Sequence, residues 1–147
     1  MTGYLLDTNV VSALAPANPS RDHTALDWLQ ANTTALFLSV VTIVEIEAGI
    51  ANAARKGARR KADALTAWLE AILHLSGQRV LPIDTPTARA AGRLDGIARG
   101  AGIAPGFADI AIAATVATNG LMLLTRNLRH FRPLGLPIHD LFQGLPP

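Results

Sequence analysis

The sequence predicts an α/β protein in which helices cover both faces of a central, mainly parallel sheet, a three-layer α/β/α sandwich. Two observations predict it. Short apolar runs that do not alternate with polar residues follow the pattern of buried parallel strands, and longer segments of helical period separate them. Because 147 residues, of which 50% are hydrophobic and 16% charged, can bury one sizeable core, we expect one domain over residues 1–147.

The elements are expected in the following order. The first strand, 4–6, leads into a short helix, 10–14, and then a helix over 23–32 that carries Trp28. A second apolar run, 36–39, precedes two longer helical segments, 41–54 and 59–75. The third strand covers 80–83. The alternation of strands and helices is typical of a layered sheet, whose ligands bind beyond the carboxyl ends of the strands.

The last third of the chain continues the alternation. Asp84-Thr85-Pro86 is a typical cap-and-proline start for a helix over 86–99. A nearly all-apolar segment, 108–118, predicts a central helix, and Asn119-Gly120 after it favours a left-handed helix end. The runs 121–125 and 137–139 complete the expected sheet.

Composition excludes several classes of protein. The chain has no cysteine, which rules out disulfides, thiolate metal sites and cysteine nucleophiles and suits a reducing cytoplasm. Its most apolar stretch, 108–124, is interrupted by Asp109 and Asn119, unlike a membrane span. The N-terminal residues lack a signal-peptide pattern. We therefore expect a soluble, cytoplasmic protein with no membrane partner.

Positive charge is gathered in two runs, although the formal net charge is only +2. The first run holds five cations between residues 55 and 61, and the second holds Arg126, Arg129, His130 and Arg132. Each run is either a solvated surface or a contact for phosphate groups, and the sequence leaves both interpretations open.

Three acidic residues stand at a strand end or a helix start. Asp7 follows the first strand and either caps the next helix, as Thr8 and Asn9 also could, or holds a ligand. Glu45 fits a capping box with Thr42, or it serves a site at the start of a largely apolar helix. Asp109 opens the most apolar helix, where a carboxylate needs a partner or a cation.

These three carboxylates can meet at one edge of a layered sheet. Carboxylates that lie close together raise one another's pKa values unless a cation lies between them. Oxygen ligands of this kind suit Mg²⁺ or Mn²⁺, and such a metal can activate water against a phosphodiester. The residues alone therefore indicate metal-dependent phosphodiester chemistry.

The segments LLDTNVVSAL, TIVEIEAGI and FADIAIAATVATNGLMLLTRNLRHF, in this order, resemble a PIN-domain ribonuclease, most closely the VapC-type toxins of prokaryotic toxin–antitoxin pairs. The resemblance extends from Leu5 to about Ile138. It implies a Mg²⁺-dependent endoribonuclease, with RNA as the substrate, a cognate antitoxin as the partner and a homodimer as the assembly.

Carried over residue by residue, the resemblance makes Asp7, Glu45 and Asp109 the catalytic acids. It implies a metal held mainly by Asp7 and Asp109, with Glu45 acting directly or through water. Supporting or substrate-contacting roles fall on five further residues: Thr8, Asn9, Thr125, Arg126 and Asn127.

One departure from the family pattern lies after the fourth strand. Many PIN domains place a fourth acid there, whereas this chain has Asn127 and His130, which makes a second tightly held metal doubtful. His130 either reaches a phosphate or, beside Phe131, has a structural role, and a structural role is the more common of the two. The chain lacks the motifs of P-loop nucleotidases, serine hydrolases and zinc peptidases, and those of haloacid-dehalogenase phosphatases. The remaining alternative is a PIN-like module that binds RNA or a partner without cleaving.

Overall fold

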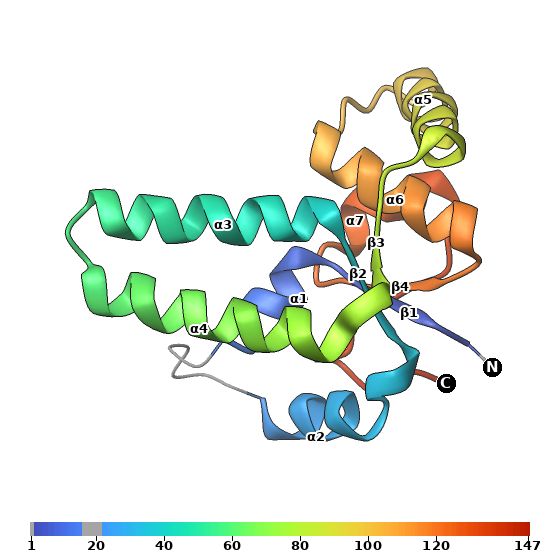
Figure 1. Cartoon of the computed structure of the whole chain (residues 1–147). Helices are drawn as coiled ribbons and strands as arrows, with labels where there is room; N and C mark the ends of the chain where they lie inside the picture. Colours follow the sequence, from blue (N-terminus) through green and yellow to red (C-terminus); the bar gives the residue numbers. More distant parts are fainter. Residues whose placement is uncertain (1, 16–21) are drawn as a thin grey trace.

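The computed structural model describes residues 2–15 and 22–147 (Figure 1). Its centre is a parallel sheet in the order β3-β2-β1-β4-β5, with Leu5 opposite Phe37 on one side and Leu123 on the other. The strands are β1 (Tyr4–Leu6), β2 (Leu36–Ser39), β3 (Val80–Leu81), β4 (Met122–Leu124) and β5 (Ile138–His139). The predicted fold class is confirmed.

Seven α-helices connect and cover the strands in the described part of the chain. They are α1 (Thr8–Ala13), α2 (His23–Ala31), α3 (Val40–Arg55), α4 (Arg59–Ser76), α5 (Thr85–Gly100), α6 (Phe107–Asn119) and α7 (Leu128–Phe131). The first six correspond to expected helices. Helix α7 was not expected, because four residues are too few to show a helical period.

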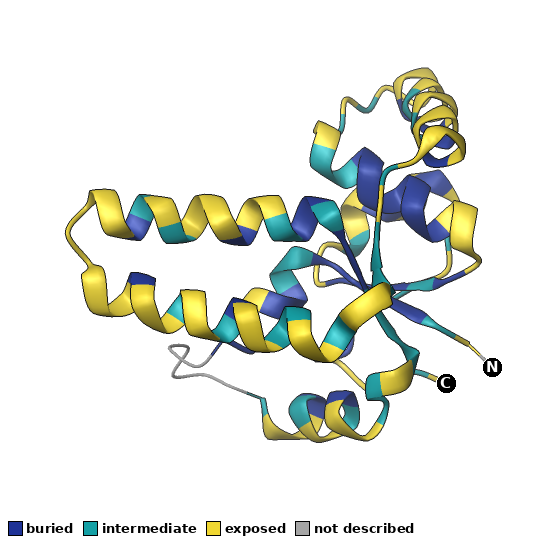
Figure 2. Ribbon diagram, in the orientation of Figure 1, coloured by how far each residue is buried: buried dark blue, intermediate teal, exposed yellow. Residues whose placement is uncertain are grey.

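Helices lie on both faces of the sheet and bury two hydrophobic cores (Figures 1 and 2). Leu5 packs with α5, α6 and α7 on one face, whereas Tyr4 and Leu6 pack with α1, α2, α3 and α4 on the other. Successive residues of a strand point to opposite faces, so a three-residue strand contributes to both cores. This arrangement is the expected three-layer sandwich.

Helix α6 is the central helix of its layer. Every residue from Ile110 to Val116 is buried, and Gly120 ends the helix in the left-handed conformation with φ of 62°, as predicted. Its first turn carries Asp109 at the rim of the sheet. None of the helices in the described residues is both long and apolar enough to cross a membrane.

Helices α3 and α4 form an antiparallel hairpin that projects away from the sheet (Figure 1). The turn between them contains Gly57, whose φ of 81° suits glycine better than other residues. At the base of the hairpin Trp68 is half-buried and packs against the second core. The hairpin therefore presents long helical faces to solvent.

Phe131 anchors α7 to the sheet and its side chain is fully buried. We expect Phe131→Ala to lower the free energy of unfolding by about 3–5 kcal/mol, because the substitution leaves a cavity in the core. Chemical denaturation measures this loss, and Phe142→Ala, which changes a half-buried ring at the surface, is the control. A loss below about 1 kcal/mol for Phe131→Ala would contradict the packing.

Candidate acidic site at the carboxyl edge of the sheet

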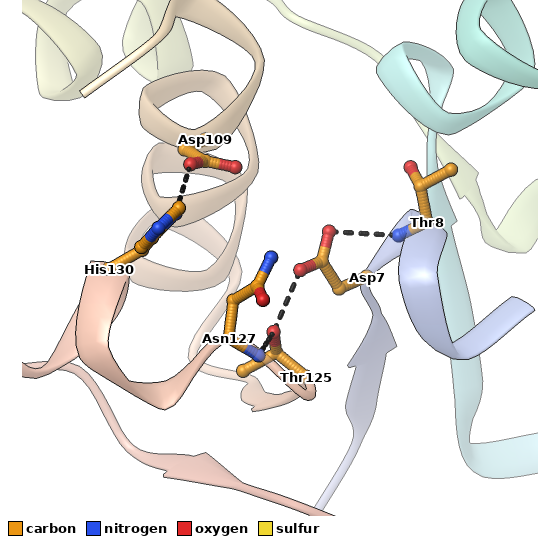
Figure 3. Close-up of polar contacts among 6 residues, drawn as sticks. All are labelled: Asp7, Thr8, Asp109, Thr125, Asn127 and His130. Atoms are coloured by element: carbon orange, nitrogen blue, oxygen red, sulfur yellow. Dashed lines mark hydrogen bonds and ion pairs between the residues drawn. The ribbon is translucent and has the colours of Figure 1, made fainter.

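The carboxyl ends of the neighbouring strands β1 and β4 bring two distant segments of the chain together. Asp7 follows β1 and Thr125 follows β4, and the Asp7 amide donates to the Leu124 carbonyl at 2.9 Å. Helix α6 and helix α3 add Asp109 and Glu45 beside them. All three predicted acids and Thr125 thus lie at the rim where a ligand is expected (Figure 3 shows Asp7, Asp109 and Thr125).

Asp7 is a buried carboxylate, with only 4% of its surface exposed. Its Oδ1 accepts from the Thr8 amide and so caps α1, and its Oδ2 accepts from the Thr125 hydroxyl, both at 2.8 Å (Figure 3). Burial raises the pKa of Asp7, the two hydrogen bonds lower it, and the charges of Asp109 and Glu45 raise it further. The capping role and the site role therefore coexist in one side chain.

Glu45 takes part in the site through Thr8. The Ser39 hydroxyl caps α3 by accepting from the Val41 amide, so the capping-box interpretation of Glu45 is wrong. Glu45 Oε1 instead accepts from the Thr8 hydroxyl at 2.6 Å. Because that hydroxyl has one proton and gives it to Glu45, the Thr42 hydroxyl, 3.0 Å away, is the donor to Thr8. Thr8 thus joins the Asp7 loop to the Glu45 carboxylate.

Asp109 is not the cap of its helix, since Gly106 takes that position. Its carboxylate Oδ2 lies 3.0 Å from His130 Nδ1, and the two side chains are 26% and 57% exposed (Figure 3). The His130 ring therefore lies outside the core and faces the acid, and its role stays a prediction. The adjacent Phe131 supplies the buried anchor instead.

The remaining predicted residues hold the loop that follows β4. The backbone N–H of Asn127 donates to the Thr125 hydroxyl at 2.9 Å, and the Asn127 side chain points between Asp7 and Asp109 (Figure 3). Asn9 Oδ1 accepts from the backbone amide of Arg126 at 3.2 Å. The Arg126 guanidinium stacks 4.8 Å from the centre of the Phe142 ring.

Sequence reasoning missed two of these contacts. The pairing of His130 with Asp109 depends on α7, which was too short to predict, and the link from Thr42 to Thr8 depends on the register of α3 against α1. The one available signal was the position of His130 three residues after Asn127, which places both on one turn of a helix.

The acidic site offers fewer converging side chains than a cage built wholly of protein ligands would need. In residues 2–15 and 22–147, no three acidic or histidine side chains converge closely enough to enclose an ion by themselves. Mg²⁺, however, keeps several waters and commonly binds one or two carboxylates together with substrate phosphates. A buried acid whose pKa is raised partly by two neighbouring acids fits such a hydrated cation.

The fold and the site define a class of α/β protein that carries three carboxylates at the carboxyl edge of a parallel sheet, a donor set compatible with metal-dependent phosphodiester chemistry. The comparisons with known proteins agree. The sequence model of the PIN domain matches residues 4–134. VapC ribonuclease Y4jK of Sinorhizobium fredii is 38% identical over 91% of this chain and 94% of its own length. Toxin FitB of Neisseria gonorrhoeae is 33% identical over 86% of this chain and 89% of its own length.

The solved structures agree with the sequence comparison. The crystal structure of FitAcB from Neisseria gonorrhoeae superimposes with a TM-score of 0.83 at 29% identity, covering 95% of this chain and 98% of the other. The chain belongs to the PIN domain family, as the resemblance implied, and is a VapC-type member of it. A structure described as a toxin–antitoxin complex from Klebsiella pneumoniae shares the fold, with a TM-score of 0.64 at 21% identity over 95% of this chain and 98% of the other.

The raised pKa of Asp7 gives a stability test. The Asp7 carboxyl binds its proton more tightly in the folded protein than in the unfolded chain, where its pKa is 3.8. Protonated Asp7 therefore favours the folded state at low pH, and this contribution to the free energy of unfolding is lost as the pH rises through the raised pKa. In chelator, we therefore expect the Tm of Asp7→Asn minus the Tm of the wild type to increase between pH 4 and pH 8. Thermal unfolding measures the difference.

The control for this experiment is Asp63→Asn, which neutralises an exposed acid on α4. Its Tm difference from the wild type should not increase over the same interval. A flat or falling difference for Asp7→Asn would show that burial does not disfavour the Asp7 charge.

Proposed function

We propose that this protein is a Mg²⁺-dependent endoribonuclease that hydrolyses RNA phosphodiester bonds and acts as the toxin of a toxin–antitoxin pair. The observation that carries the proposal is the set of Asp7, Glu45 and Asp109 at one edge of the sheet, where the latter two raise the pKa of the buried Asp7. The VapC ribonuclease and toxin among the relatives support it.

Asp7 and Asp109 would hold the cation, with Glu45 contributing directly or through water, and Mn²⁺ is an alternative ion. When bound, the metal supplies charge stabilisation for the phosphate and lowers the pKa of water. Asp7 is suited to this role because its hydrogen bonds to Thr8 and Thr125 fix both of its oxygens in orientation.

The other side chains would orient water and substrate. Glu45 is the base that positions or deprotonates the attacking water, and Thr8 holds its carboxylate in place. The Asn127 amide, which points between the two metal-holding acids, is a donor to a phosphate oxygen. Thr125 and Asn9 keep the strand ends in register.

A basic surface lies next to the acids. Arg126, Arg129, His130 and Arg132 line a hollow of about 430 Å³, and Arg129 and His130 also border a second hollow with Asp109. Cations in this place neutralise RNA phosphates, so binding should weaken as the salt concentration rises. We propose that Arg126 and Arg129 guide the RNA backbone to the cleavage site.

The test is cleavage of a mixed cellular RNA pool by antitoxin-free protein, with Mg²⁺ or with chelator. We expect discrete cuts that require Mg²⁺ and a fall in rate on the order of 10³-fold for Asp7→Asn and for Asp109→Asn, because losing a metal ligand removes several kcal/mol of transition-state stabilisation. Asp63→Asn should cleave at the wild-type rate. Full activity in either site variant would overturn the site assignment.

A second candidate function is a PIN module that binds RNA or a partner without cleaving. The observation that favours it is that, among the described residues, no three metal-ligating side chains form one cluster. It predicts that the folded wild type binds RNA, leaves it intact with Mg²⁺ or Mn²⁺, and behaves like Asp7→Asn. The cleavage experiment therefore separates the two functions.

We propose that the antitoxin binds an apolar groove that lies beside α4, away from the α3 hairpin partner. The groove measures about 220 Å³ and lies between α1, α2 and α4. Its walls include Leu14, Leu26, Trp68, Ile72 and Leu75. Apolar clefts of this kind take the apolar face of an amphipathic helix. The toxin–antitoxin complexes among the structures of this fold support this choice of occupant.

Leu75 is 65% exposed at the rim of the groove, so Leu75→Asp should leave the fold intact. We expect cells that co-express the cognate antitoxin to survive the wild-type toxin but to be inhibited by Leu75→Asp. Ile97→Asp, which changes a 54% exposed residue on α5, is the matched control and should remain neutralised. Equal neutralisation of both variants would exclude the groove.

Exposed apolar side chains also support the expected homodimer. Val44 on α3 and Phe107 at the start of α6 are among the largest exposed apolar residues of the described chain. Such residues are typical of surfaces that become buried in an assembly.

A further inference from the structure

A hollow between α1, α3 and α4 opens from the acidic site along the helical hairpin. Its volume is about 330 Å³, and its walls include Glu45, Gly49, Lys61, Leu65 and Trp68. We call it the hairpin hollow. Glu45 closes the end nearest the sheet, where Thr8 ties it to Asp7. The hollow is therefore continuous with the proposed cleavage site through a shared side chain.

Gly49 keeps this hollow open. It lies four residues after Glu45 on α3, so it is on the same helical face and about 6 Å farther along the axis. A Cβ built at this position meets nothing within 4 Å. Close packing against another element therefore does not require this glycine, although glycine weakens a helix interior. The open space suits the close approach of a ligand.

The far end of the hairpin is strongly basic. Arg55, Lys56, Arg59, Arg60 and Lys61, which we call the basic tip, are all exposed. Among the described residues none of the five forms an ion pair, and Arg55 donates only to Asn52 Oδ1. Lys56 follows the last residue of α3 and lies 11 positions after Glu45, which is about 16 Å along the helix axis. Lys61 belongs to both the basic tip and the hairpin hollow.

We propose that the hairpin hollow binds an unpaired nucleotide of the RNA beside the scissile phosphate, and that the basic tip holds the phosphates that follow. This inference rests on the proposed ribonuclease function and names the part of the substrate that the protein selects. Proteins that bind single strands combine a basic path for the backbone with aromatic or apolar walls for the bases. Here Lys61 provides the former and Trp68 and Leu65 the latter.

The substrate class follows from the size and charge of this surface. A hollow of about 330 Å³ is at the lower end of the range for small-molecule sites, ~300–1,000 Å³, and fits one splayed base but not a duplex. RNA loops and ends present such bases. The basic tip, whose five cations form no ion pair within the described part of the chain, favours a polyanion as the ligand. An apolar helix fits better in the apolar groove between α1, α2 and α4.

The test is binding of a fluorescent single-stranded RNA oligonucleotide of mixed sequence, measured by anisotropy in chelator so that no cleavage occurs. Gly49→Leu places a side chain in the hollow, where its Cβ meets no other atom within 4 Å, and we expect affinity to fall about tenfold, the effect of one lost base contact. Ala48→Leu adds the same side chain to an exposed neighbouring position and should bind like the wild type.

A second variant tests the basic tip. Arg59→Ala/Lys61→Ala removes two cations and should reduce the slope of log affinity against log salt by about 1.4, because each phosphate contact on a single strand contributes about 0.7. Arg89→Ala/Arg93→Ala on α5 changes the net charge equally and should leave the slope unchanged. Thermal unfolding confirms that each variant is folded.

An independent signal comes from Trp68. The chain has two tryptophans, so Trp28→Phe leaves Trp68 as the only one. RNA should alter its fluorescence in this background, and Gly49→Leu should abolish the change. Because all readouts are made without cleavage, they stand even if the protein proves to bind RNA without cutting it.

Three results would overturn the inference. The first is a wild type that does not bind the oligonucleotide. The second is equal affinity for Gly49→Leu and Ala48→Leu, or an equal salt slope for the two double variants. The third is equal binding of a duplex and a single strand, which would exclude a site for an unpaired base. Binding of an acidic peptide by a protein that does not bind the RNA would instead assign the hollow to a protein partner.

Discussion

The hydrogen bond between Asp7 and Thr125 is the interaction on which the site depends. It joins the ends of β1 and β4, 118 residues apart in the sequence, and it fixes one oxygen of a carboxylate that is almost fully buried. It also extends to the loop that carries Asn127, because the Asn127 backbone amide donates to the Thr125 hydroxyl, and the contact of the Arg126 amide with Asn9 Oδ1 ties the same loop to α1 a second time. One threonine thus organises two loops at the edge of the sheet.

The same contact does not remove the cost of burying a charge. Two hydrogen bonds lower the pKa of Asp7, yet burial and the charges of Asp109 and Glu45 outweigh them. The charged form of Asp7 is therefore disfavoured by its own surroundings, and a bound cation would offset the repulsion among the three carboxylates. On the other side of the site, His130 Nδ1 lies 3.0 Å from Asp109 Oδ2. Stability and ligand binding oppose each other at this edge.

The sequence predicted the parts of the molecule that have strong local patterns. The apolar strands and the buried helix α6 were found because each is a continuous apolar run bounded by turn or capping residues, and its length separates strand from helix. Asp7 and Asp109 were found because they stand at a strand end and a helix start, whereas Glu45, expected at a helix start, lies in the second turn of α3. The partner of Glu45 was not found, because Thr8 and Glu45 are 37 residues apart and meet only through packing of α1 against α3. Short helices such as α7 leave no period to detect.

The Trp68 side chain is a shared wall of the two surfaces proposed for the antitoxin and for RNA. It lines both the apolar groove between α1, α2 and α4 and the hairpin hollow between α1, α3 and α4. The indole is half-buried, so a ligand that packs against it from one side limits its rotamers on the other. An antitoxin helix in the groove would then change the shape of the hollow that we assign to RNA. Inhibition by such a helix would not require it to cover the acids, because the coupling would pass through the wall that both sites share.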